Sequence, residues 1–164
     1  LNAKKNSQIV GLRYFNVFGH GEAHKSNMAS VAYHFNNQIR ETGELKLFEG
    51  SHGYADGEQL RDFIAVEDVV DVNLWFMSKH NVSGIFNVGT GQSNSFNNVA
   101  NAVIDWHKKG KINYISFPDS LKDSYQSFTQ ANLLKLRSTG YDHKFTSLKD
   151  GVNSYLNILN SNSN

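Results

Sequence analysis

Three side chains in this sequence have types and positions suited to chemistry: Asn16, Lys25 and Arg61. Asn16 lies at the end of an apolar run that begins at Leu12, and Lys25 follows in a polar stretch. Ligands of α/β proteins gather at the carboxyl ends of parallel strands. Asn16 can donate to a sugar or phosphate oxygen, or it can cap a turn. Lys25 can transfer protons if burial or a neighbouring cation lowers its pKa; otherwise it is a solvated loop lysine.

Arg61 opens a short apolar segment, Arg61 to Val66. Its planar guanidinium group can form two hydrogen bonds to a phosphate. The alternative is a surface ion pair with Asp62. His34 lies near an apolar helix face and can reach a ligand, or it is a helical histidine with its own partners. Tyr125 follows Pro118 in a loop, where it can stack on a ligand, hydrogen-bond to one, or pack.

Several glycine and histidine patterns do not complete a known motif. Gly89-x-Gly91 has Asn94 where a dinucleotide fingerprint needs its third glycine, and Gly50-x-x-Gly53-x-x-x-Gly57 has the wrong spacing. Both are predicted to be turns. His20 and His24 have the spacing of a helical metal pair, but the stretch is loop-like. No metal site is predicted.

Length and composition exclude several classes of protein. A chain of 164 residues normally forms one domain with a sizeable core. Sixteen basic against fifteen acidic residues give no field for nucleic acid or a membrane surface. The absence of Cys excludes disulfides and fits a cytoplasmic protein. No run can span a bilayer, and a start at Leu1 leads us to expect a fragment or processed product.

Strands and helices are expected to alternate. Extended segments are expected at Ile9–Val17, Leu45–Phe48, Arg61–Val66, Gly84–Val88 and Ile112–Phe117. The helix faces expected to point inward are Met28, Val31, Ala32, Phe35 and Ile39; Val66, Val69, Val70, Asn73, Leu74 and Met77; Phe96, Val99, Val103 and Ile104; and Leu148, Val152, Tyr155 and Leu159. Ser95 and Ser147 are expected N-caps, and a further helix is expected from Thr129 to Arg137. This alternation predicts an α/β fold with a largely parallel sheet.

At this point a resemblance to a known superfamily becomes visible. Leu12–Gly19, Arg61–Val69 and Gly84–Gly91 are similar, in this order, to segments of extended short-chain dehydrogenases/reductases of the NAD-dependent epimerase/dehydratase type. The narrower resemblance is to ADP-L-glycero-D-manno-heptose 6-epimerases. It rests on His24–Ala32, Leu47–Ser51, Asp71–Phe76 and Phe117–Ala131, and it runs from about Ser7 to about Leu159, matching the C-terminal half of those enzymes.

The resemblance implies the C-terminal part of an NAD(P)-binding Rossmann fold interleaved with a small α/β substrate-binding cap. Residues 1–20 and 62–110 would belong to the Rossmann domain, 21–61 and 111–159 to the cap, and 160–164 to a frayed tail. The glycine fingerprint and the Tyr-x-x-x-Lys pair are absent from the sequence. Both are expected in a missing N-terminal Rossmann half.

The activity implied is interconversion of ADP-D-glycero-β-D-manno-heptose and ADP-L-glycero-β-D-manno-heptose for lipopolysaccharide core synthesis. Epimerisation at C6″ would proceed through a transient oxidation that depends on NADP, because a carbinol carbon cannot be inverted by deprotonation alone. The family assembles as a pentamer. The isolated chain is expected to be inactive.

The resemblance also assigns roles to residues. Lys25 would be the second acid/base, and Val17 would lie against the cofactor. The residues implied to contact the ADP-sugar are Asn16, Asn27, His34, Phe48, Glu49, Gly50, Ser51, Arg61 and Tyr125. Lys25-Ser26-Asn27 replaces the usual Lys-Gly-Ser of the family.

Two other functions stay open from the sequence. One is another extended short-chain enzyme, such as a nucleotide-sugar 4-epimerase or dehydratase. The other is a nucleotide-sugar binding module without catalysis.

Overall fold

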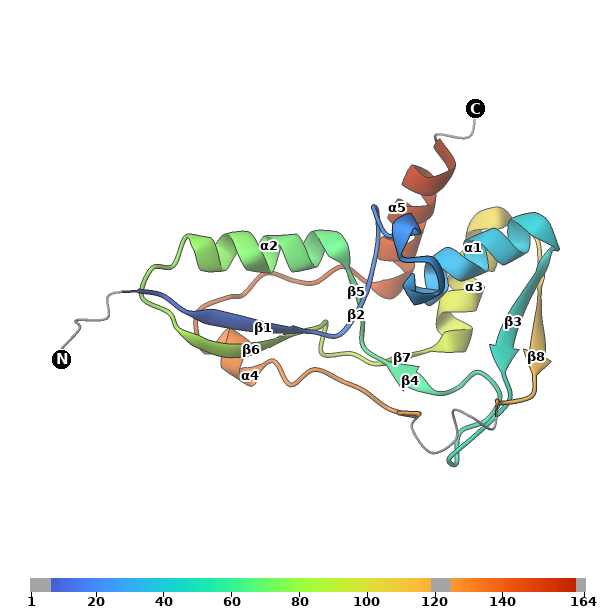
Figure 1. Ribbon diagram of the computed structural model, residues 1–164, viewed down its shortest axis with the longest axis horizontal. Coiled ribbons are helices and arrows are strands. Elements are labelled where there is room, and N and C mark those ends of the chain that lie inside the picture. Colours follow the sequence, from blue (N-terminus) through green and yellow to red (C-terminus); the bar gives the residue numbers. More distant parts are fainter. Residues whose placement is uncertain (1–6, 119–124, 162–164) are drawn as a thin grey trace.

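The computed structural model describes residues 7–118 and 125–161, in which strands alternate with helices (Figure 1). The strands are β1 (Val10–Tyr14), β2 (Asn16–Phe18), β3 (Glu44–Phe48), β4 (Leu60–Arg61), β5 (Phe63–Ala65), β6 (Gly84–Val88), β7 (Asn94–Ser95) and β8 (Lys111–Ile115). The helices are the 3₁₀ segment η1 (Ala23–Met28), α1 (Val31–Glu41), α2 (Val66–Met77), α3 (Phe96–His107), α4 (Leu134–Arg137) and α5 (Leu148–Ser161). The predicted α/β class is confirmed.

The described strands form four pairs, of which three are parallel. β1 pairs with β6, β2 with β5 and β3 with β8, whereas β4 and β7 are antiparallel. The predominantly parallel pairing agrees with the sequence prediction. In Figure 1, β1 and β6 lie beneath α2 at one end of the molecule, and β3 and β8 lie beside α1 at the other.

The prediction of one continuous buried strand from Ile9 to Val17 is wrong. The segment forms two strands, β1 and β2, because the backbone changes its pairing partner at Phe15. The Phe15 N–H donates to the Val88 carbonyl at 2.9 Å, and the next N–H, that of Asn16, donates to the Asp62 carbonyl at 3.0 Å. The strand therefore leaves β6 and joins β5. Ile9 is also 68% exposed, so the run is not buried throughout.

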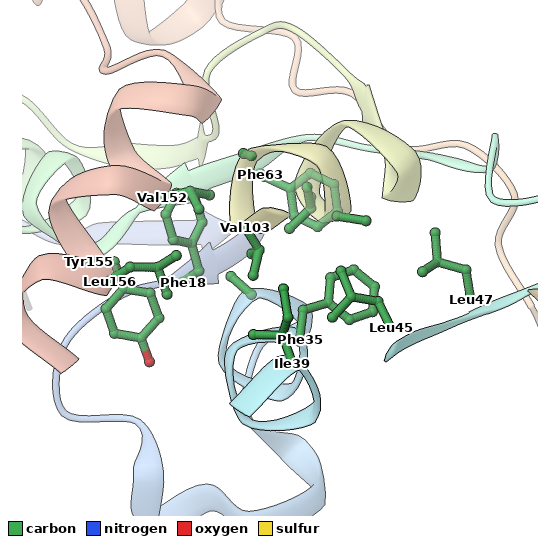
Figure 2. Close-up of a cluster of buried hydrophobic side chains, with 14 of the residues drawn as sticks. Phe18, Phe35, Ile39, Leu45, Leu47, Phe63, Val103, Val152, Tyr155 and Leu156 are labelled. Carbon is green, nitrogen blue, oxygen red and sulfur yellow. The ribbon is translucent and has the colours of Figure 1, made fainter. Parts of the chain in front are cut away.

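Two clusters of buried apolar side chains hold the elements together. Figure 2 shows part of the first, which contains Phe18, Ala32, Phe35, Ile39, Leu45, Leu47, Phe63, Ala65, Val99, Ala100, Ala102, Val103, Val152, Tyr155 and Leu156. The second contains Ile64, Val69, Val72, Phe76, Phe86, Val88, Leu136, Tyr141 and Phe145. The two clusters are defined by side-chain contacts and do not mark domain boundaries. The predicted domain boundaries therefore stay a prediction.

Helix α1 begins later than the apolar spacing indicated. The Ser30 hydroxyl accepts the Tyr33 N–H at 3.3 Å, which caps α1 and separates it from η1. Met28, expected on the buried face, belongs to η1 and is 84% exposed. The remaining predicted positions of this face lie at the core.

The predicted inward face of α2 is largely wrong. Val70, Leu74 and Met77 are exposed, whereas Val72 and Phe76 are buried. The helix has apolar residues on two stripes, so spacing alone cannot select the stripe that packs. Contact with the sheet selects it: the Phe76 ring lies 4.7 Å from the Phe86 ring of β6.

The segment before α4 is extended rather than helical. A helix was expected from Thr129, but α4 covers only Leu134–Arg137. The Thr129 N–H donates to the Leu60 carbonyl at 3.0 Å, so this stretch lies along β4. That backbone pairing competes with helix formation and explains the difference.

The remaining caps follow the sequence prediction more closely. Ser95 caps α3 in a capping box with Asn98. The Ser147 hydroxyl accepts the Asp150 N–H at 3.2 Å at the start of α5. The expected frayed tail is wrong for residues 160 and 161, which are helical, and residues 162–164 lie outside the described part of the chain. Asp119, Leu121 and Lys122, which contributed to the family resemblance, also lie outside it.

Within the described residues, no helix has both the length and the apolar character needed to cross a membrane.

Candidate functional site

Arg61 is a buried cation at the end of β4, held between two aromatic rings. Its side chain lies 4.9 Å from the Tyr125 ring centroid and 5.8 Å from that of Phe96, and Arg61 is 8% exposed. One guanidinium nitrogen donates to the Leu60 carbonyl at 2.9 Å. Burial lowers the pKa of Arg61, but guanidinium stays charged near neutrality. A desolvated planar cation of this kind is suited to an anionic oxygen.

The neighbouring Asp62 is fully buried and does not form the surface pair considered from the sequence. Its carboxylate accepts the Thr90 N–H and hydroxyl at 2.7 Å each, and the N–H groups of Gly91 and Ala131 at 2.9 Å each. Asp62 therefore ties the turn after β6 and the segment before α4 to the strand that carries Arg61. It also occupies the N–H groups of the Gly89–Gly91 turn, which agrees with the interpretation of these glycines as a turn.

Tyr125 and Phe48 line a small apolar cavity beside Arg61. The cavity has a volume of about 100 Å³ and is lined by Val31, Phe35, Lys46, Leu47, Phe48, Phe96 and Tyr125. Phe117 lies between the two predicted rings, 5.2 Å from Phe48 and 4.9 Å from Tyr125. Burial raises the pKa of the Tyr125 hydroxyl and Arg61 opposes this shift. The hydroxyl is thus protonated at neutral pH and available as a donor.

A second cavity, of about 300 Å³, shares Val31 and Phe96 with the first and contains Asn16 and Val17. A third, of about 470 Å³, shares Asn16 with the second and is also lined by Asn87 and Gln126. The three cavities adjoin one another from β3 to the carboxyl ends of β1 and β6. The structure therefore brings five predicted residues to one surface: Asn16, Val17, Phe48, Arg61 and Tyr125.

Three other predicted residues lie near this surface without lining these cavities. Lys25 and Asn27 are exposed on η1, and His34 is half-buried on α1 with its ring 5.8 Å from the Tyr33 ring. The residues directly after Asn27, from Met28 to Val31, line the 300 Å³ cavity. The loop that carries Lys25 thus ends at the site, while the Lys25 side chain itself faces solvent.

The segment after Phe48 forms a supported turn. The Gly50 N–H donates to an Asp56 carboxylate oxygen at 2.7 Å, and a Cβ on Gly50 would collide with the Tyr54 carbonyl. The Gln59 side-chain amide donates to the Glu49 carbonyl at 3.1 Å and to the Ser51 hydroxyl at 3.3 Å. Of the predicted run Phe48 to Ser51, only Phe48 lines a cavity described above.

A larger hollow lies elsewhere, between α3 and the start of α5, with a volume of about 820 Å³. None of the predicted site residues lines it, and two of its three cations, Arg137 and Lys149, already have partners. Arg137 donates to the carbonyls of Tyr141 and His143 at 3.0 and 2.8 Å, and Lys149 pairs with Asp105 at 3.0 Å. This hollow is therefore a weaker candidate than the surface beside Arg61.

Sequence reasoning missed three residues that support the site. Phe96 was expected only as a core residue, yet it contacts Arg61 and lines two cavities. Asp62 was considered only as a surface partner of Arg61, although its place in an apolar segment indicated burial. Glu22 was not considered; it is an acidic residue only 4% exposed, and it precedes Lys25 by one turn.

Comparisons with known proteins agree with this architecture. The family model described as the NAD dependent epimerase/dehydratase family matches residues 1–89. An ADP-L-glycero-D-manno-heptose-6-epimerase of Alkalilimnicola ehrlichii is 55% identical over 154 residues, which are 94% of this chain and 48% of that protein. The chain thus spans about half the length of the curated relative it matches.

Solved structures give the same result for the fold. The crystal structure of the ADP-L-glycero-D-manno-heptose-6-epimerase of Helicobacter pylori matches with a TM-score of 0.79 and 33% identity, covering 93% of this chain and 44% of that one. The UDP-N-acetylglucosamine 4-epimerase of Methanobrevibacter ruminantium has a TM-score of 0.78 at 22% identity, covering 93% and 46%, and supports the fold alone. The chain belongs to the NAD dependent epimerase/dehydratase family.

Proposed function

We propose that this chain forms the substrate-binding part of an ADP-L-glycero-D-manno-heptose 6-epimerase that acts in lipopolysaccharide core heptose synthesis. The observation that carries the proposal is the buried Arg61 guanidinium between Phe96 and Tyr125, beside a cavity lined by Phe48. A cation and aromatic rings in this arrangement suit the diphosphate and base of a nucleotide sugar. The 55% identity to a heptose epimerase supports the choice among nucleotide sugars.

In this proposal each residue acts on one part of the substrate. Arg61 binds the diphosphate, and Tyr125 and Phe48 pack against the nucleotide-sugar at the same end of the surface. Asn16 orients the heptose from the start of β2, two residues after the end of β1. Lys25 takes and returns a proton at the C6″ oxygen, opposite a tyrosine supplied from outside this chain. Asn27, His34, Glu49, Gly50 and Ser51 complete the substrate site.

The residues present fit one wall of a nicotinamide cofactor site. Val17 lies in the middle of β2, opposite Ile64 of the parallel strand β5, and lines the same cavity as Asn16. The glycine turn of this chain does not fit the pyrophosphate, because Asp62 already accepts its N–H groups. When bound, NADP supplies hydride removal and return at the carbinol carbon. We propose that residues outside this sequence hold most of the cofactor.

The test uses a chimeric enzyme, called the complemented enzyme below. In it, this chain is fused to the part of the Alkalilimnicola ehrlichii relative that the chain does not match. We expect epimerisation of ADP-heptose with NADP, and no activity from the 164-residue chain alone. Turnover of UDP-glucose but not ADP-heptose would favour a 4-epimerase instead. Binding of ADP-heptose by the isolated chain, measured by calorimetry, with no turnover by the complemented enzyme would favour a binding module. Light scattering would test the pentamer expected from the family.

Lys25→Ala in the complemented enzyme tests the acid/base role. We expect kcat to fall by about 100-fold or more, because general acid–base catalysis contributes factors of this size. Lys109→Ala is the control, since Lys109 is an exposed lysine in the loop after α3 and lines none of the cavities of the site. A Lys25→Ala enzyme with near-normal turnover would show that this residue is a solvated loop lysine.

A further inference from the structure

Glu22 is a buried acidic residue at the start of the loop that carries Lys25. It is 4% exposed, although the residues after it, from Ala23 to Met28, are exposed. Its carboxylate accepts the Ser30 N–H and the Ser30 hydroxyl at 2.6 Å each, and the Gly19 N–H at 3.4 Å. Gly19 follows β2 and Ser30 caps α1, so one side chain joins the two ends of the loop. Charged acceptors form the strongest hydrogen bonds of this kind.

The backbone of Glu22 also fixes Lys25 directly. The Lys25 N–H donates to the Glu22 carbonyl at 2.9 Å, which closes the first turn of η1. The entry to the loop packs closely against α2, because a Cβ on Gly19 would collide with Val66. The position of Lys25 relative to β2 and α1 is therefore set through Glu22.

The loop needs this support because its backbone is strained next to Lys25. Ser26 has φ 49° and ψ −124°, a conformation that favours glycine. Such residues are destabilised by about 1–3 kcal/mol and persist only where surrounding contacts hold them. The Glu22 hydrogen bonds are the contacts that span this turn from one side to the other.

The Glu22 carboxylate affects a hydroxyl of the first apolar cluster, that of Tyr155. Burial, followed by the Glu22 carboxylate, raises the pKa of this hydroxyl. Figure 2 shows the hydroxyl pointing out of the cluster. It has no hydrogen-bond partner within the described residues.

We propose that Glu22 is a positioning residue: its buried carboxylate holds the Lys25 loop in the geometry needed for proton transfer. This inference rests on the proposed function, in which Lys25 is an acid/base. It concerns the chemical step rather than binding, because the carboxylate contacts the loop ends and Arg61 lies on a separate element.

The test compares Glu22→Ala and Glu22→Gln in the complemented enzyme, with the exposed Glu41→Gln on α1 as control. We expect Glu22→Ala to lower kcat by about 10- to 100-fold, since misplacement of a catalytic group has effects of this order, while KM for ADP-heptose changes by less than about twofold. Glu22→Gln can still accept the Ser30 N–H and donate to the Ser30 hydroxyl. The kcat of Glu22→Gln should fall by only about threefold, so the conservative variant should restore most of the activity lost in Glu22→Ala.

A double-mutant cycle with Lys25→Ala separates positioning from general stability. If Glu22 acts through Lys25, Glu22→Ala should cause no further loss of kcat once Lys25 is absent. An equal further loss in the Lys25→Ala background would overturn the inference, as would equal losses for Ala and Gln. If Glu22→Ala does not fold, Glu22→Gln is used in the same cycle, and its threefold loss must disappear. Failure of Lys25→Ala to slow turnover would count against the proposed function itself.

Discussion

Arg61 and Lys25, the two cations assigned to substrate, are supported in opposite ways. Arg61 lies on a strand, buried between two rings, beside an aspartate with four hydrogen bonds. Lys25 lies on an exposed 3₁₀ segment whose two ends are joined by one carboxylate. The proposed binding group is therefore fixed before substrate arrives, which limits the ordering required on binding. The proposed proton-transfer group lies on a segment with few buried contacts, where local stability is low.

Asp62→Ala should have the largest effect, because it removes the hydrogen bonds that support the strand carrying Arg61. The substitution leaves four donors without their acceptor, of which the Ala131 N–H is buried and the other three are partly buried, so we expect a loss of about 3–5 kcal/mol in the free energy of unfolding. Urea unfolding of the complemented enzyme, followed by tryptophan fluorescence, measures this loss. The exposed Asp142→Ala should change stability by less than about 0.5 kcal/mol. A similar small effect at Asp62 would mean that this carboxylate does not hold the site together.

A substitution at Arg61 itself tests recognition rather than stability. Arg61→Lys keeps the charge but loses the planar guanidinium that lies over the Phe96 and Tyr125 rings. We expect KM for ADP-heptose to rise about tenfold and kcat to change less, because stacked cations contribute about 1–2 kcal/mol when desolvated. Steady-state kinetics of the complemented enzyme gives both values, with Arg40→Lys on α1 as the exposed control. A fall in kcat at unchanged KM would indicate that Arg61 acts in the chemical step rather than in substrate binding.

The second apolar cluster, which contains neither cation, gives a pH-dependent reference. Burial, followed by the charges of Asp68 and Asp71, raises the pKa of Tyr141 to about 12. An unfolded tyrosine loses its proton near pH 10, so between pH 10 and 12 the unfolded state binds fewer protons than the folded state. Stability should therefore fall as pH rises through this window, by at most about 1.4 kcal/mol per pH unit from this group.

Tyr141→Phe should remove this part of the alkaline slope. Urea unfolding at pH 9, 10 and 11 measures it, and the half-exposed Tyr14→Phe is the control. An unchanged slope in Tyr141→Phe would assign alkaline destabilisation to other groups.

The smallest expected effect concerns the Lys25 loop. Ser26→Gly removes the steric penalty at φ 49° while increasing the freedom of the unfolded chain, so we expect a net gain of about 0.5–1 kcal/mol. Gly21→Ala in the same loop should do the reverse. Gly21 has φ 89° with no heavy atom near its would-be Cβ, so its penalty is purely conformational. Thermal melting of both variants checks the signs, and destabilisation by Ser26→Gly would refute strain at this position.

The sequence predicted the alternation of elements well because strand and helix periodicities are local. Val99 and Val103 of α3, and Val152 and Tyr155 of α5, are buried as expected. Local pattern failed where distant contacts decide. The break at Phe15 depends on the carbonyls of Val88 and Asp62, and the face of α2 depends on Phe86. Prediction of the site residues likewise succeeded where residue type was enough and failed where distant contacts decide.

Arg61 and Tyr125 were predicted from residue type, and the structure places them together. Phe96 and Glu22 could not be recognised as support for the site because their partners are brought together only by folding. Glu22, for example, binds Ser30 across the whole Lys25 loop.

Asp62 also has a consequence for how the chain folds. Its carboxylate bonds to residues 28, 29 and 69 positions further along the sequence. Contacts of such high sequence separation require long loops to close before they contribute, and this slows folding. We therefore expect the carboxylate to acquire its partners late in folding. Substitutions at Asp62 should then accelerate unfolding more than they retard refolding.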